Sequence, residues 1–304
     1  MHIHSRSLKY FDMIRRCGSI REAARQIHVV SSALNRQLIQ LEEQVGYPLF
    51  ERLPSGMKLT AAGEIFARHV MTVMQDEQRL IAELDAFKGV RCGHLRVIAA
   101  DGLSSQFMPE VLTTMRASYP KVTIEVERAG GKVAAKAVAD GDADVAMGFT
   151  NERYDGLEQF AMGRFRMGAI VSRSHPLAAK RHTTLAECAQ YPLLMPTDEI
   201  STFAPLEQAV RQLKRPVDAV MRVGSMNLMY SLALRDVGVA FATQIGIERE
   251  HELVHVPFKG LPLLYSELGV YTRANRSRTP ALDAFLRIAE AEIDRLVERG
   301  GVSA

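Results

Sequence analysis

One stretch constrains the fold of this chain most: residues 60–87 contain no proline and a single glycine, Gly63. Within it, apolar side chains recur in alternating steps of four and three residues, with one acidic member: Phe66, Val70, Val73, Glu77, Leu80, Leu84 and Phe87. This heptad spacing is typical of a coiled coil and predicts a helix of roughly 40 Å. A lone helix of that length must cover its apolar stripe. We expect a second copy of the chain to cover it; packing on its own chain is the alternative.

The predicted helix separates two parts of the chain that differ in charge. The first sixty residues carry nine Lys or Arg and five Asp or Glu, whereas the remaining residues carry 29 and 30. The net charge of +4 in the short N-terminal part favours a polyanionic partner for it. The full length of 304 residues is enough for two or three compact units.

Two short helices are predicted ahead of a third. Leu8, Phe11 and Ile14 fall three apart, as on one helix face, and Ser7 is placed to cap that helix. The segment "SIRE" at residues 19–22 is a capping box and begins a second helix. The side chains that the second helix would bury are Ala23, Ala24 and Ile27.

The third helix, "HVVSSALNRQLIQLE" at residues 28–42, has two different faces. Leu34, Leu38 and Leu41 form its inner stripe at helical spacing. Its outer face carries Ser32, Asn35, Arg36 and Ile39. Short polar donors and a guanidinium suit base edges and phosphates in a major groove. Any exposed helix face is polar, however, so this helix by itself leaves both interpretations open.

The segment that follows supports the DNA-binding interpretation. "PLFERLPSGMKLT" at residues 48–60 contains two short apolar segments around the turn signal Pro54-Ser55-Gly56. Arg52 and Lys58 flank that turn. Three compact helices followed by a basic hairpin predict a winged helix-turn-helix, in which the third helix enters the major groove and the wing touches the neighbouring backbone. The residues predicted to bind DNA are Arg21, Ser31, Ser32, Asn35, Arg36, Arg52 and Lys58.

The same run resembles the N-terminal domain of LysR-type transcriptional regulators. The resemblance is carried by "GSIREAA", "SSALNRQLIQLEEQVGYPLFER" and "LTAAG", in one order and spacing. Arg36 and Arg52 match family positions directly, whereas Ser31, Ser32 and Asn35 stand where the family commonly has Gln-Pro before Ala-Leu-Ser-Arg. The resemblance therefore implies the family's DNA-reading helix but leaves its base preference open.

The resemblance also implies an assembly. A linker helix at 61–88 would join two copies into a homodimer or homotetramer, together with the effector domains. The dimer would present two recognition helices to a pseudo-palindromic promoter site on double-stranded DNA. RNA polymerase is the further partner that the resemblance implies.

Beyond a glycine-containing hinge at 89–93, the chain alternates predicted strands with helical patterns. The predicted strands are residues 95–100, 122–127, 143–149, 166–172, 191–196, 217–223, 238–243 and 267–272, and residues 279–300 form a final amphipathic helix. This alternation predicts an α/β class with a mostly parallel sheet.

The resemblance continues more weakly through "DGDADVAMGF", "SRSHPLA" and "LRDVGVAFAT". It implies two Rossmann-like α/β subdomains of the periplasmic-binding-protein type, with crossings near residues 163 and 267. The implied limits are 1–60 for the DNA-binding domain, 61–88 for the linker, 89–93 for the hinge and 94–304 for the effector domain, with subdomain I at 94–163 and 267–304 and subdomain II at 164–266.

Ligands of open parallel sheets bind beyond strand C-termini, where helix N-termini offer free amides. Three loops follow strands in this way, and Ser104, Thr202 and Asn227 are expected at converging helix starts. The predicted small-molecule effector contacts are Asp101, Gly102, Leu103, Ser104, Phe149, Thr197, Ser201, Thr202, Ser225, Met226 and Asn227. Routine N-capping is the alternative explanation of the hydroxyl and amide side chains.

Asp101 departs from the family, which often has Ser or Thr near this loop, suited to a carboxylate effector. An acid there would repel an anion unless it points away. The sequence therefore leaves a neutral, zwitterionic or cationic effector open.

The sequence lacks the motifs of other protein classes. It contains no phosphate loop, Cys-x-x-Cys, His-Glu-x-x-His or nucleophile elbow, so no catalytic residue, metal or cofactor is expected. No apolar run long enough for a membrane span and no signal peptide are apparent, and the cytoplasm is the expected location. Cys92 and Cys188 lack a local basic cluster that would favour a redox thiolate. An α/β enzyme or a solute-binding protein is the alternative class, but it leaves residues 1–60 unexplained. The sequence predicts a DNA-binding regulator that responds to a small molecule.

Overall fold

The computed structural model describes residues 6–87, 92–149, 154–198, 200, 203–213, 217, 219–245, 247, 252–260, 265–274 and 277–300. The chain divides into two compact units, Met1–Lys88 and Gly89–Ala304. No helix within the described part of the chain is long and apolar enough to cross a membrane.

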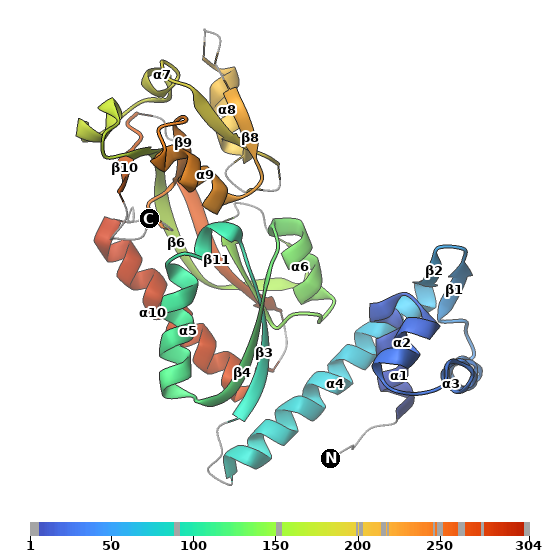
Figure 1. Ribbon diagram of the computed structural model, residues 1–304. Helices are drawn as coiled ribbons and strands as arrows, with labels where there is room; N and C mark the ends of the chain where they lie inside the picture. Colours follow the sequence, from blue (N-terminus) through green and yellow to red (C-terminus); the bar gives the residue numbers. More distant parts are fainter. Residues whose placement is uncertain are drawn as a thin grey trace. The chain divides into compact units, whose positions relative to one another are not determined.

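The first unit contains the predicted helices and wing (Figure 1). Its elements are α1 (Arg6–Cys17), α2 (Ile20–Gln26), α3 (Ser31–Val45), β1 (Phe50–Leu53), β2 (Gly56–Leu59) and α4 (Ala61–Phe87). Ser19 caps α2 as predicted, because its hydroxyl accepts from the Glu22 amide at 3.4 Å. Ser7 lies inside α1 instead of preceding it, so its predicted capping role is wrong.

A close backbone contact fixes the wing against the helices. Gly18 adopts a positive φ of 60° between α1 and α2, and its carbonyl accepts from the Met57 amide at 2.7 Å. A Cβ atom on Gly56 would lie 2.5 Å from the Gly18 carbonyl oxygen. Glycine is therefore required at this turn, and the wing is held beside the helical core.

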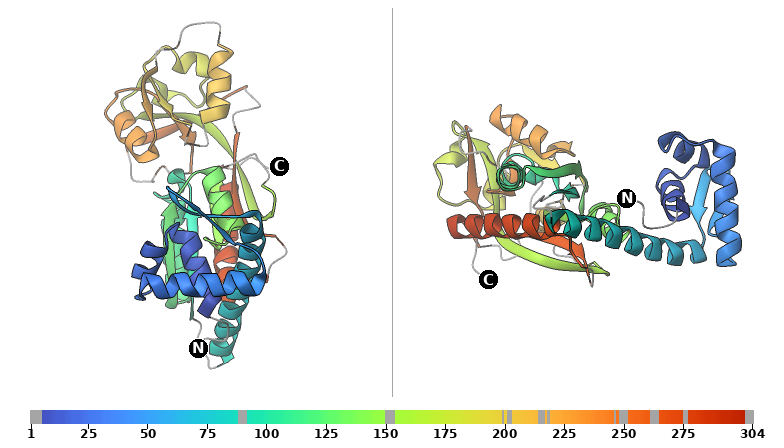
Figure 2. Two further views of the ribbon diagram at one scale, coloured as in Figure 1. Left: turned by 90° about the vertical axis from the view of Figure 1, so that its right-hand side faces the viewer. Right: turned by 90° about the horizontal axis from the view of Figure 1, so that it is seen from below.

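The long helix α4 is continuous, as predicted (Figure 2). The first part of its stripe is covered by its own chain: Val70 is fully buried in the core of the unit, and Phe66 packs edge-on against Phe11 with 4.9 Å between ring centroids. Glu77 is buried and lies 3.8 Å from the Lys9 ammonium of α1. The expectation that a partner copy covers the whole stripe is therefore wrong for its first part.

The second part of the stripe lies open. Leu80 and Leu84 are 41% and 44% exposed, whereas Val70 earlier in the stripe is fully buried. The side chain of Phe87, the last member of the predicted seam, lies outside the described part of the chain. Leu80 and Leu84 are therefore exposed members of the predicted stripe among the described residues.

The second unit is an α/β structure built on a curled mixed sheet (Figure 1). The sheet order is β10-β6-β11-β5-β3-β4, and β9 also pairs with β6. The strands are β3 (Cys92–Ala99), β4 (Lys121–Arg128), β5 (Val145–Phe149), β6 (Leu157–Ser172), β9 (Ala240–Thr243), β10 (Leu253–Pro257) and β11 (Tyr265–Arg273). A separate two-stranded sheet contains β7 (Leu193–Pro196) and β8 (Ala219–Val223).

The helices cover these sheets on several sides, and α5 packs beside α10 (Figure 1). They are η1 (Asp101–Leu103), α5 (Phe107–Ser118), α6 (Gly131–Ala139), η2 (Pro176–Ala179), α7 (Leu185–Cys188), α8 (Phe203–Arg211), α9 (Met226–Leu234) and α10 (Pro280–Gly300).

The expectation of a mostly parallel sheet is only partly correct. β3 is parallel to β4 and β5, with helices that supply the crossover connections, and β7 is parallel to β8. The long strands β6 and β11 are antiparallel to each other, and β5, β9 and β10 join them antiparallel as well. The strand pattern also missed β10 and the first nine residues of β6, which begins at Leu157 instead of Arg166.

The long strand β6 belongs to two hydrophobic cores. Phe165 lies in the core formed with α5 and α10, whereas Met167 lies in the core that contains Leu185 and Phe241. The two-subdomain architecture predicted for the C-terminal part is confirmed by this arrangement. Residues 89–91 of the predicted hinge lie outside the described residues, and Cys92 and Gly93 already belong to β3.

Candidate nucleic-acid and effector sites

The third helix places its polar side chains as the predicted DNA-binding face requires. Leu34, Leu38 and Leu41 are buried in the core of the first unit. Ser32 and Arg36 are exposed, and Ser31 and Asn35 are half-buried. Because three leucines fix one side of the helix, the opposite side must face outward near its N-terminal end.

The start of α3 lacks a side-chain N-cap. Its N-cap residue is Val30, which is 70% exposed and makes no side-chain hydrogen bond to the helix. A serine or threonine at an N-cap would satisfy one amide of the first turn. The first turn of α3 therefore carries no such side-chain cap at the end that bears Ser31 and Ser32.

The wing is joined to α3 by a side-chain contact. Arg52 of β1 donates from Nη2 to the Asn35 Oδ1 at 2.7 Å. Lys58 is exposed on β2, where its backbone pairs with Glu51. Arg21 is exposed in the first turn of α2. Arg52 thus places one of the predicted basic groups directly beside the N-terminal half of α3.

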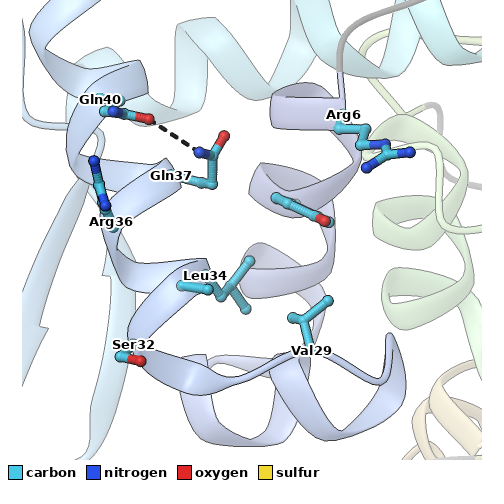
Figure 3. A pocket seen from close by; sticks show the side chains of 9 residues that line it. Arg6, Val29, Ser32, Leu34, Arg36, Gln37 and Gln40 are labelled. Atoms are coloured by element: carbon cyan, nitrogen blue, oxygen red, sulfur yellow. Dashed lines mark hydrogen bonds between the residues drawn. The ribbon is translucent and has the colours of Figure 1, made fainter.

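A hollow of about 690 Å³ lies on the other flank of α3, between this helix and α1 (Figure 3). It is lined by Arg6, Tyr10, Val29, Ser32, Ala33, Leu34, Arg36, Gln37 and Gln40. Figure 3 shows Arg6 and Arg36 on opposite sides of it, and the Gln37 amide donates to the Gln40 Oε1 at 3.0 Å. Arg6 is not among the residues predicted from the sequence, because the spacing of the first helix indicates only its buried face.

In the second unit, one carboxylate connects two distant parts of the chain. Asp101 in η1 accepts from the Met226 amide at the start of α9, with 2.7 Å between Oδ2 and N. Its other oxygen lies 3.2 Å from Nη1 of Arg128 at the end of β4. A Cβ atom on Gly102 would lie 3.6 Å from Phe149 and 3.9 Å from Met226. Asp101, Gly102, Phe149 and Met226 are therefore gathered at one place.

Two buried hydroxyl groups lie near α9: Tyr230 is within this helix, and the backbone amide of Thr197 donates to the Val223 carbonyl shortly before it. Tyr230 lies one turn after Met226 in α9, and it is 8% exposed. Among the described residues, neither its hydroxyl nor the buried Oγ1 of Thr197 has a hydrogen-bond partner. Burial, and secondarily the charge of Asp101, raises the pKa of Tyr230, so this group remains a neutral hydroxyl at ordinary pH. Tyr230 was absent from the predicted set because its helix spacing marks it as core.

The remaining predicted effector residues have different surroundings. The Ser225 hydroxyl caps α9 by accepting from the Leu228 amide at 3.4 Å, as the capping alternative requires. Asn227 is exposed in the first turn of α9. Leu103 is fully buried in a hydrophobic core, and Ser104 ends η1, so it does not start a helix. Ser201 and Thr202 lie outside the described residues.

The structure also describes the surroundings of the Cys188 thiol and of the side chains that could hold a metal ion. Cys188 is fully buried, and burial raises the pKa of its thiol to about 11, which disfavours the reactive thiolate. Within the described ranges, no group of three His, Cys, Asp or Glu side chains is arranged to hold a metal ion.

Comparison with known proteins identifies a family for both parts of the chain. Residues 5–64 match the bacterial regulatory helix-turn-helix family of lysR type, and residues 88–294 match the LysR substrate binding domain. Because the second match covers more than half of the chain, the chain belongs to the LysR family of regulators.

The similar proteins cover nearly the whole chain. The RuBisCO operon transcriptional regulator of Allochromatium vinosum is 24% identical over 97% of this chain and 98% of its own length. A full-length OxyR point mutant from Pseudomonas aeruginosa has the same fold, with a TM-score of 0.72 and 17% identity over 95% of this chain and 98% of that one. CbnR in complex with its target DNA has a TM-score of 0.59, with 20% identity over 94% and 99% of the two chains.

The family and the fold define the class of protein. It is a DNA-binding transcriptional regulator, with an N-terminal helix-turn-helix domain and a C-terminal domain that binds a small-molecule effector. Its relatives are likewise described as regulators of transcription and not as enzymes.

Proposed function

We propose that α3 enters the major groove and that Arg36, with Ser31, Ser32 and Asn35, contacts base edges there. The observation that carries this proposal is the outward placement of these side chains opposite a stripe of buried leucines. Arg36 is the one cation of this set, and a guanidinium is the side chain best suited to a guanine edge.

The basic groups on the two flanks of α3 would hold the phosphate backbones. Arg52 of the wing contacts α3 on one flank, Lys58 is exposed on the same wing, and Arg6 lies across the hollow on the other flank. A helix that enters a groove is bordered by a backbone on each side, so cations on both flanks fit this placement. Arg21 at the start of α2 would add a further phosphate contact.

We further propose a homodimer, or a tetramer built from dimers, that binds a pseudo-palindromic promoter site. The support is the open end of the α4 stripe, where Leu80 and Leu84 are exposed. Linking two recognition domains makes the second half-site contact intramolecular, which strengthens operator binding. RNA polymerase is the partner through which such a regulator would change transcription.

The effector site that we propose lies where subdomain I, taken as 94–163 and 267–304, meets subdomain II, taken as 164–266. Its residues are Asp101, Gly102, Phe149, Thr197, Ser225, Met226 and Asn227, with Tyr230 added from the structure. An effector that contacts both subdomains can change their relative orientation, but only by its difference in affinity for the two arrangements. This difference is typically about 1–3 kcal/mol.

Two experiments test this function. Genomic footprinting identifies the operator, and a thermal-shift screen of metabolites on the full-length protein identifies the effector. With both in hand, Asn227→Ala should reduce the effector response without changing operator binding in its absence. Ser225→Ala should lower the free energy of unfolding by about 1 kcal/mol through loss of its cap. A normal response from the Asn227 variant would move the effector site elsewhere.

A further inference from the structure

The start of α9 is a place where an anion would ordinarily be stabilised. The amides of a first helical turn lack partners within the helix, and the helix dipole adds partial positive charge there. In this chain two amides of the first turn of α9 already donate to side chains. Asp101 accepts from the Met226 amide at 2.7 Å, and Ser225 accepts from the Leu228 amide at 3.4 Å.

Asp101 also engages the nearest cation. Its Oδ1 lies 3.2 Å from Arg128, whose side chain is 61% exposed, while the Asp101 side chain is only 14% exposed. One carboxylate of the chain thus takes up both an amide and a guanidinium, the two groups that would otherwise bind the carboxylate of a ligand.

We propose that Asp101 is a resident anion of the effector site, which restricts effectors to molecules without an anionic group at the start of α9. A carboxylate ligand would meet the charge of Asp101 and would find the Met226 amide and Arg128 already engaged. This inference rests on the proposed effector site and names the chemical class that the site accepts: neutral or cationic compounds.

The rest of the site fits such compounds. Tyr230 and Thr197 carry buried hydroxyls without hydrogen-bond partners among the described residues, and each can both donate and accept. A neutral alcohol, amide or amine can satisfy a hydroxyl of this kind. Phe149 and Met226, which flank Gly102, supply an apolar wall. The charge of Asp101 lies near enough to Tyr230 to contribute to its raised pKa, which places the hydroxyl and the carboxylate in one region.

The test exchanges Asp101 in the full-length protein. Asp101→Asn keeps an oxygen that can accept from Met226 but removes the charge, and Asp101→Ser also opens space. Isothermal titration then compares acetate and benzoate with the neutral benzamide and the cationic benzylamine. Asp101→Ser should bind at least one of the two anions more tightly than the wild-type protein does, by about tenfold or more, because Arg128 and the Met226 amide are released.

A matched control removes a carboxylate from the other end of the same helix. Asp236 follows α9 and accepts from the Ser174 hydroxyl at 2.9 Å, so Asp236→Asn should gain no affinity for either anion. The proposal would be overturned if neither Asp101 variant bound acetate or benzoate more tightly than the wild-type protein, or if neither variant bound them at all. It would also be overturned if the wild-type protein bound benzoate as tightly as the Asp101 variants do. These titrations contain no DNA. A failure here leaves the regulatory function standing, whereas an effector screen without any responsive compound would count against the function itself.

Discussion

Arg52 Nη2 donates to the Asn35 Oδ1 over 2.7 Å and so joins the wing to the exposed edge of α3. The two residues lie 17 positions apart in the sequence, one on α3 and the other on β1. An amide oxygen that already accepts from a guanidinium offers less capacity to another donor, so in the proposed DNA complex Asn35 would present mainly its two N–H donors. In that complex Arg52 would act on base recognition as well as on the backbone.

Exchange of Arg52 separates these two effects. Arg52→Ala should weaken binding to all DNA and flatten the salt dependence by about one unit, because one phosphate contact is lost. Arg52→Lys should keep the charge and the salt slope but relax the base preference opposite Asn35, since lysine lacks the planar fork. Titrations of operator variants at several salt concentrations measure both. An unchanged base preference in both variants would show that Asn35 is oriented without Arg52.

Arg36 should contribute specificity directly. Arg36→Ala should lower the affinity for the specific site by about 1–3 kcal/mol, with a smaller loss on nonspecific DNA. Arg181→Ala, which removes an exposed arginine from the second unit, serves as the charge-matched control. Wild-type operator affinity in a folded Arg36 variant would remove this residue from the interface.

Assembly should depend on the exposed end of α4. Charging Leu80 and Leu84 (both to Glu) should give monomers with poor operator affinity, because two linked half-sites gain from effective concentration. Ile65→Glu is the matched control, since Ile65 is 64% exposed on the same helix but outside the heptad stripe. Sedimentation that finds a dimer held by α4 in the double variant would refute the proposed interface.

The uncapped start of α3 offers a gain in stability. Val30→Ser should raise the free energy of unfolding by about 0.5–1 kcal/mol, because a serine hydroxyl at the N-cap satisfies an amide of the first turn. The substitution removes little buried apolar surface, since the Val30 residue is 70% exposed. Denaturant unfolding compares this variant with Val30→Ala, which removes the same side chain without adding a cap. Equal stability of the two variants would show that a hydroxyl at position 30 does not cap α3.

The buried thiol of Cys188 should make stability fall at alkaline pH. Its pKa is about 11 in the folded chain against an ordinary value of 9.0, so the unfolded chain loses its proton first. The stabilisation is fully present below the unfolded pKa and is lost as pH rises through the folded one. Between pH 9 and 11, the free energy of unfolding should therefore decline less steeply for Cys188→Ala than for the wild type. Parallel declines would indicate that Cys188 ionises equally in both states.

Local chemistry explains how much of the first unit could be predicted. The Ser19 capping box, the leucine stripe of α3 and the turn at Gly56 each depend on a few neighbouring residues, and all three occur as expected. The segments β3-α5-β4 and β4-α6-β5 were predictable for a similar reason, because parallel strands need a long crossover connection and a helix between two strands supplies one.

Tertiary structure decided what those periodicities could not. A heptad pattern fixes a stripe on a helix but not what covers it, and only folding showed that Val70 and Glu77 pack within the first unit while Leu80 and Leu84 stay exposed. The direction of β6 relative to β11 depends on a path of about a hundred residues, which no local pattern encodes. Asp101 meets Met226 across 125 residues of sequence. The sequence determined that an acid stands in the first effector loop, and the fold determined that this acid fills the start of α9, because a hydrogen bond requires two groups to meet in space.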